Sequence, residues 1–99
     1  MTDLARLAAF INSDRITRTS LADGTGVLLD VEGLHVYSLN ETGNFLVERL
    51  CEGVTAEDEL ALAVVREFEV DEETALADTR VFLADLETFF AKEKKPRKK

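Results

Sequence analysis

The hydrophobic pattern begins with a short helical segment near the N-terminus. Leu4, Leu7, Ala8 and Ile11 recur at the spacing of one helix face, after a candidate cap at Thr2 or Asp3. A helix this short depends on tertiary contacts for its stability. We therefore predict that residues 1–14 form an N-terminal extension that holds a candidate short helix.

From Arg15 the hydrophobic period changes to two. β-Branched and polar residues alternate through Ser20, which is typical of an exposed strand. Two further strands are predicted at Val27–Val31 and Leu34–Leu39, with turn residues such as Asp23-Gly24 and Glu32-Gly33 before them. Three strands joined by two tight turns predict an antiparallel meander.

After the third strand the period becomes that of a helix. Asn40 is a good N-cap for a helix through Cys51, and Gly53 suits the C′ position that ends this helix. Residues 55–58, Thr-Ala-Glu-Asp, resemble a capping box with Asp in place of Glu, and predict a second helix to about Phe68.

A third and longest helix follows a run of acidic residues, Asp71-Glu72-Glu73, which suit a helix N-terminus. Its apolar stripe recurs along the whole helix, at Leu76, Thr79, Leu83, Leu86 and Phe90. The predicted order is therefore a three-stranded antiparallel sheet followed by three helices. We expect an α+β fold that is winged helix-turn-helix-like.

Charge divides the chain into two parts. The net charge is −8, yet residues 92–99 hold six of the twelve basic residues and every lysine. Residues 1–91 therefore hold nineteen acidic residues against six basic ones. A body this acidic repels phosphate backbones, so we expect no nucleic-acid binding. Residues 92–99 contain no apolar side chain, and we predict a disordered basic tail there.

Composition places the chain among single globular domains, with 99 residues of which 45% are hydrophobic. No apolar run approaches the roughly 20 residues that a membrane-spanning helix needs. The N-terminus lacks the basic segment of a signal peptide. One cysteine, Cys51, excludes an internal disulfide. We therefore expect a cytoplasmic protein that does not associate with membranes.

The chain offers few groups for catalysis. His35 is the only histidine, and a zinc site or a catalytic triad would need partners that the sequence barely supplies. Glu48 and Glu52 lie near Cys51, and their charges would raise its thiol pKa rather than activate it. The five glycines match no phosphate-binding spacing. We expect a protein without enzymatic activity, catalytic residues, metal site or cofactor.

Three segments resemble the PqqD-like family. Residues 27–43, VLLDVEGLHVYSLNETG, are similar to that family's signature "vLLd…g-x-x-Y-x-LN-x-T/G", and residues 50–55 to its "l-x-x-G-x-T". Residues 78–86 resemble its ending "D-V-x-x-F-L-x-x-L". The resemblance covers about residues 15–90, and the domain is predicted over residues 15–91. It departs from the pattern at Thr79, where valine is usual, and at Phe89-Phe90, which replace a closing "G-L-(L/I)".

The resemblance implies a recognition element of ribosomally synthesised, post-translationally modified peptides. It implies that a precursor's leader peptide adds as a strand beside the third strand, against the third helix. The precursor would then be presented to a modifying enzyme such as a radical SAM enzyme, a lasso-peptide protease or a cyclase. Strand chemistry favours the same mode, since the third strand of a meander is an edge with unpaired main-chain groups.

Peptide contacts are predicted on the third strand and on the facing side of the third helix. Along the strand, residues that face the core alternate with residues that point away from it. On the helix, an apolar pair is flanked by two carboxylates one turn away on either side. The predicted contact residues are Leu34, Val36, Tyr37, Ser38, Leu39, Asp78, Val81, Phe82 and Asp85.

Other interpretations stay open at this point. The outward strand residues could form a second packing face or a homodimer contact, and Phe82 could be plain core. A winged-helix transcription regulator would need a basic recognition helix, whereas the second helix holds one arginine, Arg66, among four acidic residues. A small acidic accessory subunit of an enzyme is a further alternative.

Overall fold

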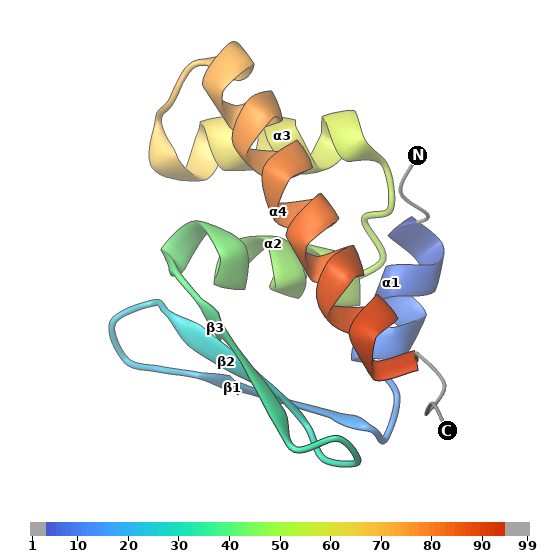
Figure 1. Ribbon diagram of the computed structural model, residues 1–99. Coiled ribbons are helices and arrows are strands. Elements are labelled where there is room, and N and C mark those ends of the chain that lie inside the picture. The colour runs from blue at the N-terminus through green and yellow to red at the C-terminus, as the bar shows by residue number, and fades with distance from the viewer. Residues whose placement is uncertain (1–3, 95–99) are drawn as a thin grey trace.

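The computed structural model of the protein describes the main chain of residues 4–94 and the side chains through Phe90. Four helices lie on one side of a three-stranded sheet (Figure 1). None of the helices in the described part is long and apolar enough to cross a membrane. In chain order the elements are α1 (Leu4–Ile11), β1 (Ile16–Ser20), β2 (Gly26–Asp30), β3 (His35–Leu39), α2 (Glu41–Cys51), α3 (Glu57–Phe68) and α4 (Glu72–Lys94).

The sheet is the predicted antiparallel meander, with the order β1-β2-β3. In the first turn the Asp23 carboxylate accepts a hydrogen bond from the main-chain N–H of Thr25 at 3.0 Å. In the second turn Leu34 has a φ of 58° and donates its N–H to the carbonyl of Asp30 at 2.7 Å. This left-handed conformation explains why β3 begins at His35 rather than at the predicted Leu34.

The two faces of the sheet differ in burial. Leu28 and Leu39 are buried beneath the helices, and Tyr37 is half-buried on the same face. On the opposite face Val36 is 61% exposed, and Leu34 in the turn before β3 is 78% exposed. The prediction that Leu34, Val36 and Ser38 point away from the core is therefore confirmed.

The helix boundaries test the predicted caps. The Asn40 side chain accepts a hydrogen bond from the N–H of Gly43 at 2.8 Å and caps α2, as predicted. Gly53 follows that helix with a φ of 105°, also as predicted. The capping box at Thr55 is wrong, because α3 begins with Ala56 as its N-cap and Thr55 lies outside the helix.

Helix α4 spans the length of the domain. The Asp71 carboxylate accepts the N–H of Thr74 at 3.2 Å near its start. The helix continues to Lys94, so the prediction that a disordered tail begins at residue 92 is wrong for residues 92–94. Residues 95–99 of that predicted tail lie outside the described residues.

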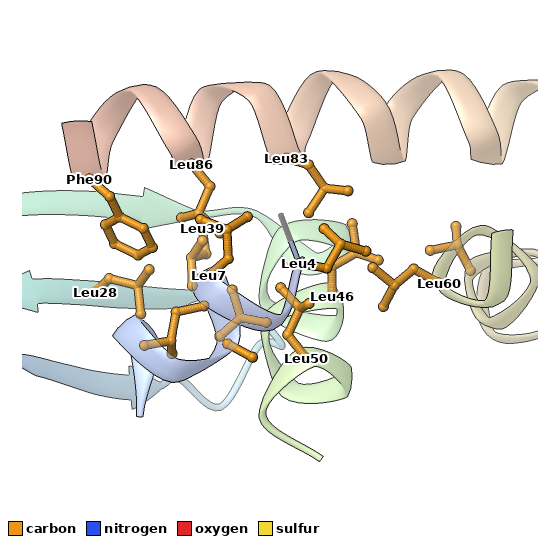
Figure 2. Packing of buried hydrophobic residues seen from close by; sticks show 14 of the residues in the cluster. Leu4, Leu7, Leu28, Leu39, Leu46, Leu50, Leu60, Leu83, Leu86 and Phe90 are labelled. Carbon is orange, nitrogen blue, oxygen red and sulfur yellow. The ribbon is translucent and has the colours of Figure 1, made fainter. Parts of the chain in front are cut away.

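One hydrophobic core joins all these elements (Figure 2). The predicted N-terminal helix is present as α1, and its apolar face is buried in the same core rather than separate from it. Burial of this face supplies the tertiary support that a helix of eight residues needs. The core is built from Leu4, Leu7, Leu28, Leu39, Leu46, Leu50, Leu60, Leu83, Leu86 and Phe90, among others.

Candidate functional site

Strand β3 forms an edge of the sheet beside α4. Its residues pair with β2 on one side, in the register Tyr37 with Leu28 and Leu39 with Gly26. Within residues 4–94 no further strand pairs with its other side. Every second N–H and C=O of β3 therefore points away from β2, as the chemistry of an edge strand requires.

A groove with a volume of about 780 Å³ lies between this edge and α4. We call it the β3–α4 groove. From β3 it is lined by Tyr37, Ser38 and Leu39, and from α4 by Asp78, Val81, Phe82 and Asp85. Its remaining lining comes from the start of α2 and the first hairpin, namely Leu21, Thr25, Gly26, Val27, Asn40, Thr42 and Gly43.

The groove brings together seven of the nine residues that the sequence predicted as peptide contacts. The other two, Leu34 and Val36, do not line it. They lie on the outer face of the sheet, exposed by 78% and 61%. Seven of the predicted residues thus line a groove and two lie on the adjacent sheet face. That they bind a peptide stays a prediction.

The α4 wall of the groove follows helical spacing. Asp78, Val81, Phe82 and Asp85 stand three, four and seven residues apart, which places them on one helix face. Val81 is 62% exposed, whereas Phe82 is half-buried. Among the described residues that line the groove, none carries a positive charge. The wall therefore presents an apolar centre between two carboxylates.

Tyr37 lines the groove and packs against aromatic side chains of α4. Its ring centroid lies 5.2 Å from that of Phe89 and 6.3 Å from that of Phe82. Burial raises the pKa of the Tyr37 hydroxyl above its ordinary value, and the negative charge of Asp85 raises it further. The phenol therefore keeps its proton, and its capacity to donate a hydrogen bond, to a higher pH than an exposed tyrosine does.

Gly43 lets the Phe82 ring approach the first turn of α2. A Cβ atom added at Gly43 would lie 2.9 Å from Cε1 of Phe82. The sequence reasoning quoted Gly43 as part of the family signature but did not assign it to the site. A glycine inside the first turn of a predicted helix, where its propensity is poor, is the signal that could have found it.

Asn44 of α2 holds the first hairpin, which forms part of the groove lining. Its side-chain amide donates to the main-chain carbonyl of Gly24 at 3.1 Å and lies 3.4 Å from the Ser20 hydroxyl. These bonds join α2 to the first hairpin, which contributes Leu21 and Thr25 to the groove. Sequence spacing gave no sign of these contacts, because they join residues 20 and 24 positions apart.

Other candidate sites are weaker. Within residues 4–94 no group of three or more His, Cys, Asp or Glu side chains could hold a metal ion. Cys51 is half-buried, and burial is the main reason that its thiol pKa is raised. The sequence analysis attributed that shift to Glu48 and Glu52, whose contributions are smaller. A raised pKa disfavours the reactive thiolate.

Comparison with known proteins gives one family and two similar structures. The family model "Coenzyme PQQ synthesis protein D (PqqD)" matches residues 25–88. A structure of TbiB1 in complex with the TbiA(beta) leader peptide is 29% identical, with a TM-score of 0.66, and the match covers 77% of this chain and 86% of that chain. A lasso peptide synthetase B1 complexed with the leader peptide is 26% identical, also with a TM-score of 0.66, over 77% and 87% of the two chains. No curated protein matches this chain.

Proposed function

The chain belongs to the PqqD family, and on this premise we propose that it recognises the leader segment of a ribosomally synthesised precursor peptide. It binds the leader by strand addition and delivers the precursor to a separate modifying enzyme. Two structurally similar proteins are each complexed with a leader peptide. The observation that carries the proposal is the unpaired edge of β3 beside an open groove.

Strand addition gives each predicted residue a role. An extended peptide that pairs with β3 alternates its side chains between two faces. One set enters the β3–α4 groove and contacts Tyr37, Phe82 and Val81. The other set lies on the outer face of the sheet beside Val36 and Leu34, which are exposed there. Main-chain hydrogen bonds supply affinity, and the groove supplies side-chain specificity.

The protein's own part is recognition, and catalysis belongs to the enzyme that receives the precursor. A transcription regulator would insert a basic helix into the DNA major groove. Helix α3 instead begins with Glu57, Asp58 and Glu59, which repel phosphates. The groove is also too acidic to hold a nucleic-acid backbone, with two carboxylates and no basic residue among its described lining.

Amide hydrogen exchange tests the proposal directly. The isotopically labelled full chain is titrated with synthetic leaders from precursor-like reading frames near its gene, and with the TbiA(beta) leader peptide. We expect slower exchange at amides of β3 that point away from β2. Strand β1, the other edge of the sheet, is the internal control and keeps its exchange rates. Binding that protects β1 instead, or leaves β3 unchanged, would refute strand addition at β3.

A variant provides a second test of the same edge. Val36→Pro removes a main-chain N–H from the centre of β3 and fixes its φ, so peptide affinity should be lost. Arg18→Pro in β1 is the matched control at the opposite edge, because the Arg18 N–H also points away from β2. Circular dichroism verifies that both variants keep their helices. Normal affinity of the Val36 variant would place the peptide elsewhere.

A further inference from the structure

We infer that the leader segment held in the β3–α4 groove carries two cationic side chains four residues apart, with an apolar side chain midway between them. This inference rests on the proposed function and names the chemistry of the peptide that the groove accepts. In an extended peptide the pattern is cation-x-apolar-x-cation, where the intervening residues point to the outer face of the sheet.

The charge pattern of the α4 wall carries the inference. Asp78 and Asp85 are seven residues apart, so their Cα atoms are separated by about 10.5 Å along the helix. Val81 and Phe82 lie between them, and Val81 is 62% exposed although it is apolar. Along the wall a carboxylate is followed by an apolar centre and then by a second carboxylate. A complementary ligand therefore has a cationic, an apolar and a second cationic side chain in that order.

The protein itself does not neutralise these carboxylates. Among the side chains described through Phe90, neither Asp78 nor Asp85 has an ion-pair partner, and no basic residue lines the groove. The neighbouring Arg80 is already engaged, because its Nε lies 3.3 Å from Oε1 of Glu57 in α3. No described side chain of the protein supplies a cation to the groove, so we assign the cations that pair with it to the ligand.

The spacing follows from strand geometry. Figure 2 shows the strands of the sheet running in the direction of α4, with Leu39 at the end of β3 near Leu86, so a peptide that is added to β3 and continues past its end also runs along the preceding part of α4. Residues on one face of an extended peptide repeat about every 6.7 Å, so those four apart are about 13 Å apart. Between two peptide residues that are four positions apart, one further side chain points to the same face. It lies opposite Val81 and Phe82. The flexible arms of lysine or arginine cover the remaining difference of roughly 3 Å.

A general attraction of cations to this acidic body is the competing explanation. Residues 1–91 hold nineteen acidic residues and six basic ones, which attracts any basic peptide over a long range. The two explanations differ in which carboxylates matter. Local recognition depends on Asp78 and Asp85, whereas a general field depends on net charge alone.

The experiment uses the full chain and three dye-labelled peptides, acetyl-Thr-Xaa-Thr-Leu-Thr-Xaa-Thr-amide, in which Xaa is Lys, Gln or Glu. Fluorescence anisotropy measures their affinities. Two weak exposed ion pairs predict that the lysine peptide binds about tenfold tighter than the glutamine peptide. The glutamate peptide should bind more weakly than both. The lysine advantage should fall at high salt, because exposed pairs are screened.

Two double variants with equal net charge separate the explanations. Asp78→Asn with Asp85→Asn should abolish most of the lysine advantage. Glu73→Gln with Glu87→Gln changes two exposed carboxylates of the same helix that do not line the groove, and should keep the advantage. Equal affinity of the three peptides, or an equal loss in both double variants, overturns the inference.

The outcome is distinguishable from failure of the proposed function. A leader without the cationic pattern that still slows amide exchange in β3 would overturn the inference and leave strand addition intact. If no natural leader protects β3, the proposed function itself fails. A lysine peptide that binds without protecting β3 overturns the inference as well, since its cations would then be held outside the groove.

Discussion

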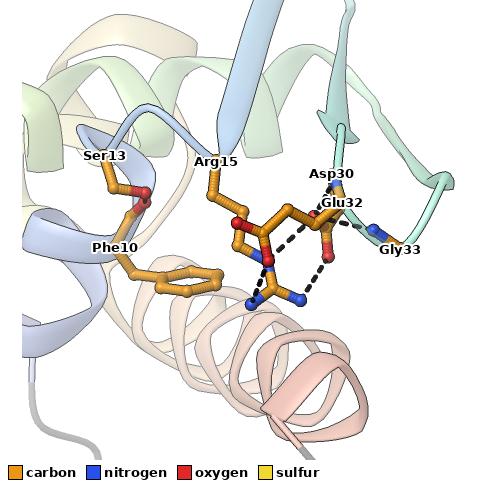
Figure 3. Close-up of polar contacts among 6 residues, drawn as sticks. All are labelled: Phe10, Ser13, Arg15, Asp30, Glu32 and Gly33. Carbon is orange, nitrogen blue, oxygen red and sulfur yellow. Dashed lines mark hydrogen bonds and ion pairs between the residues drawn. The ribbon is translucent and has the colours of Figure 1, made fainter.

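The Arg15 guanidinium and the Asp30 carboxylate form a two-point ion pair across the first hairpin (Figure 3). Nε lies 2.9 Å from Oδ1, and Nη2 lies 3.2 Å from Oδ2. The Asp30 side chain is fully buried, and its Oδ1 also accepts the main-chain N–H groups of Glu32 and Gly33 at 3.0 and 3.3 Å. One carboxylate therefore joins the start of β1 to the turn that precedes β3.

Asp30→Ala should lower the free energy of unfolding by about 3–5 kcal/mol, because the Arg15 guanidinium loses its buried partner and keeps the exposed Glu32 carboxylate, and two turn amides lose their acceptor. Asp30→Asn should lower it less, because the amide oxygen still accepts from the turn. Urea denaturation measures both values. Asp23→Ala, at the exposed turn of the first hairpin, is the control and should lower the free energy of unfolding much less. A similar loss in both alanine variants would contradict a special role for Asp30.

Thr79→Val should raise the free energy of unfolding by about 1 kcal/mol. The Thr79 side chain is fully buried, and its hydroxyl has no hydrogen-bond partner among the described residues. Valine is also the usual residue of the family at this place. Thr88→Val on the same helix is the control, because the Thr88 hydroxyl is exposed and donates to the Ala84 carbonyl. Destabilisation by Thr79→Val would show that the hydroxyl is satisfied in solution.

Tyr37 should titrate above the ordinary tyrosine pKa of about 10. Its folded-state pKa is raised, so the unfolded chain ionises first and stability falls as pH rises above about 10. Ultraviolet absorbance reports this group alone, because the chain has one tyrosine and no tryptophan. Asp85→Asn should lower the midpoint only partly, since burial is the larger cause. An unchanged midpoint would mean that Asp85 does not face the phenol.

Phe82→Ala should weaken peptide binding more than it weakens the fold. The ring is half-buried against Tyr37 and lines the groove, so its removal should cost about 1–3 kcal/mol of stability. Leu86→Ala, at a fully buried position of the same helix, should cost about 2–5 kcal/mol. Denaturation and peptide titration of both variants separate the roles. If Phe82→Ala binds normally but loses as much stability as Leu86→Ala, Phe82 is plain core.

Much of the fold could be predicted because it depends on neighbours in sequence. The change from a period of two to a helical period located three strands and three helices in the right order. The caps at Asn40 and Asp71 were also predictable, since each carboxyl or amide oxygen accepts an N–H only three residues away. The start of α3 was not, because the choice between Thr55 and Ala56 as N-cap depends on how the preceding loop packs.

The sequence by itself determined the elements, the edge position of β3, the acidic body and the residues of α4 that share one face. Tertiary structure decided which of them meet. Whether Phe82 is core or groove wall depends on how closely α4 approaches Gly43, and the ion pair of the buried Asp30 depends on Arg15, which directly precedes β1. Such contacts join residues far apart in the chain, and periodicity carries no information about them. The groove exists only because α4 packs beside an edge that no strand of the described chain covers.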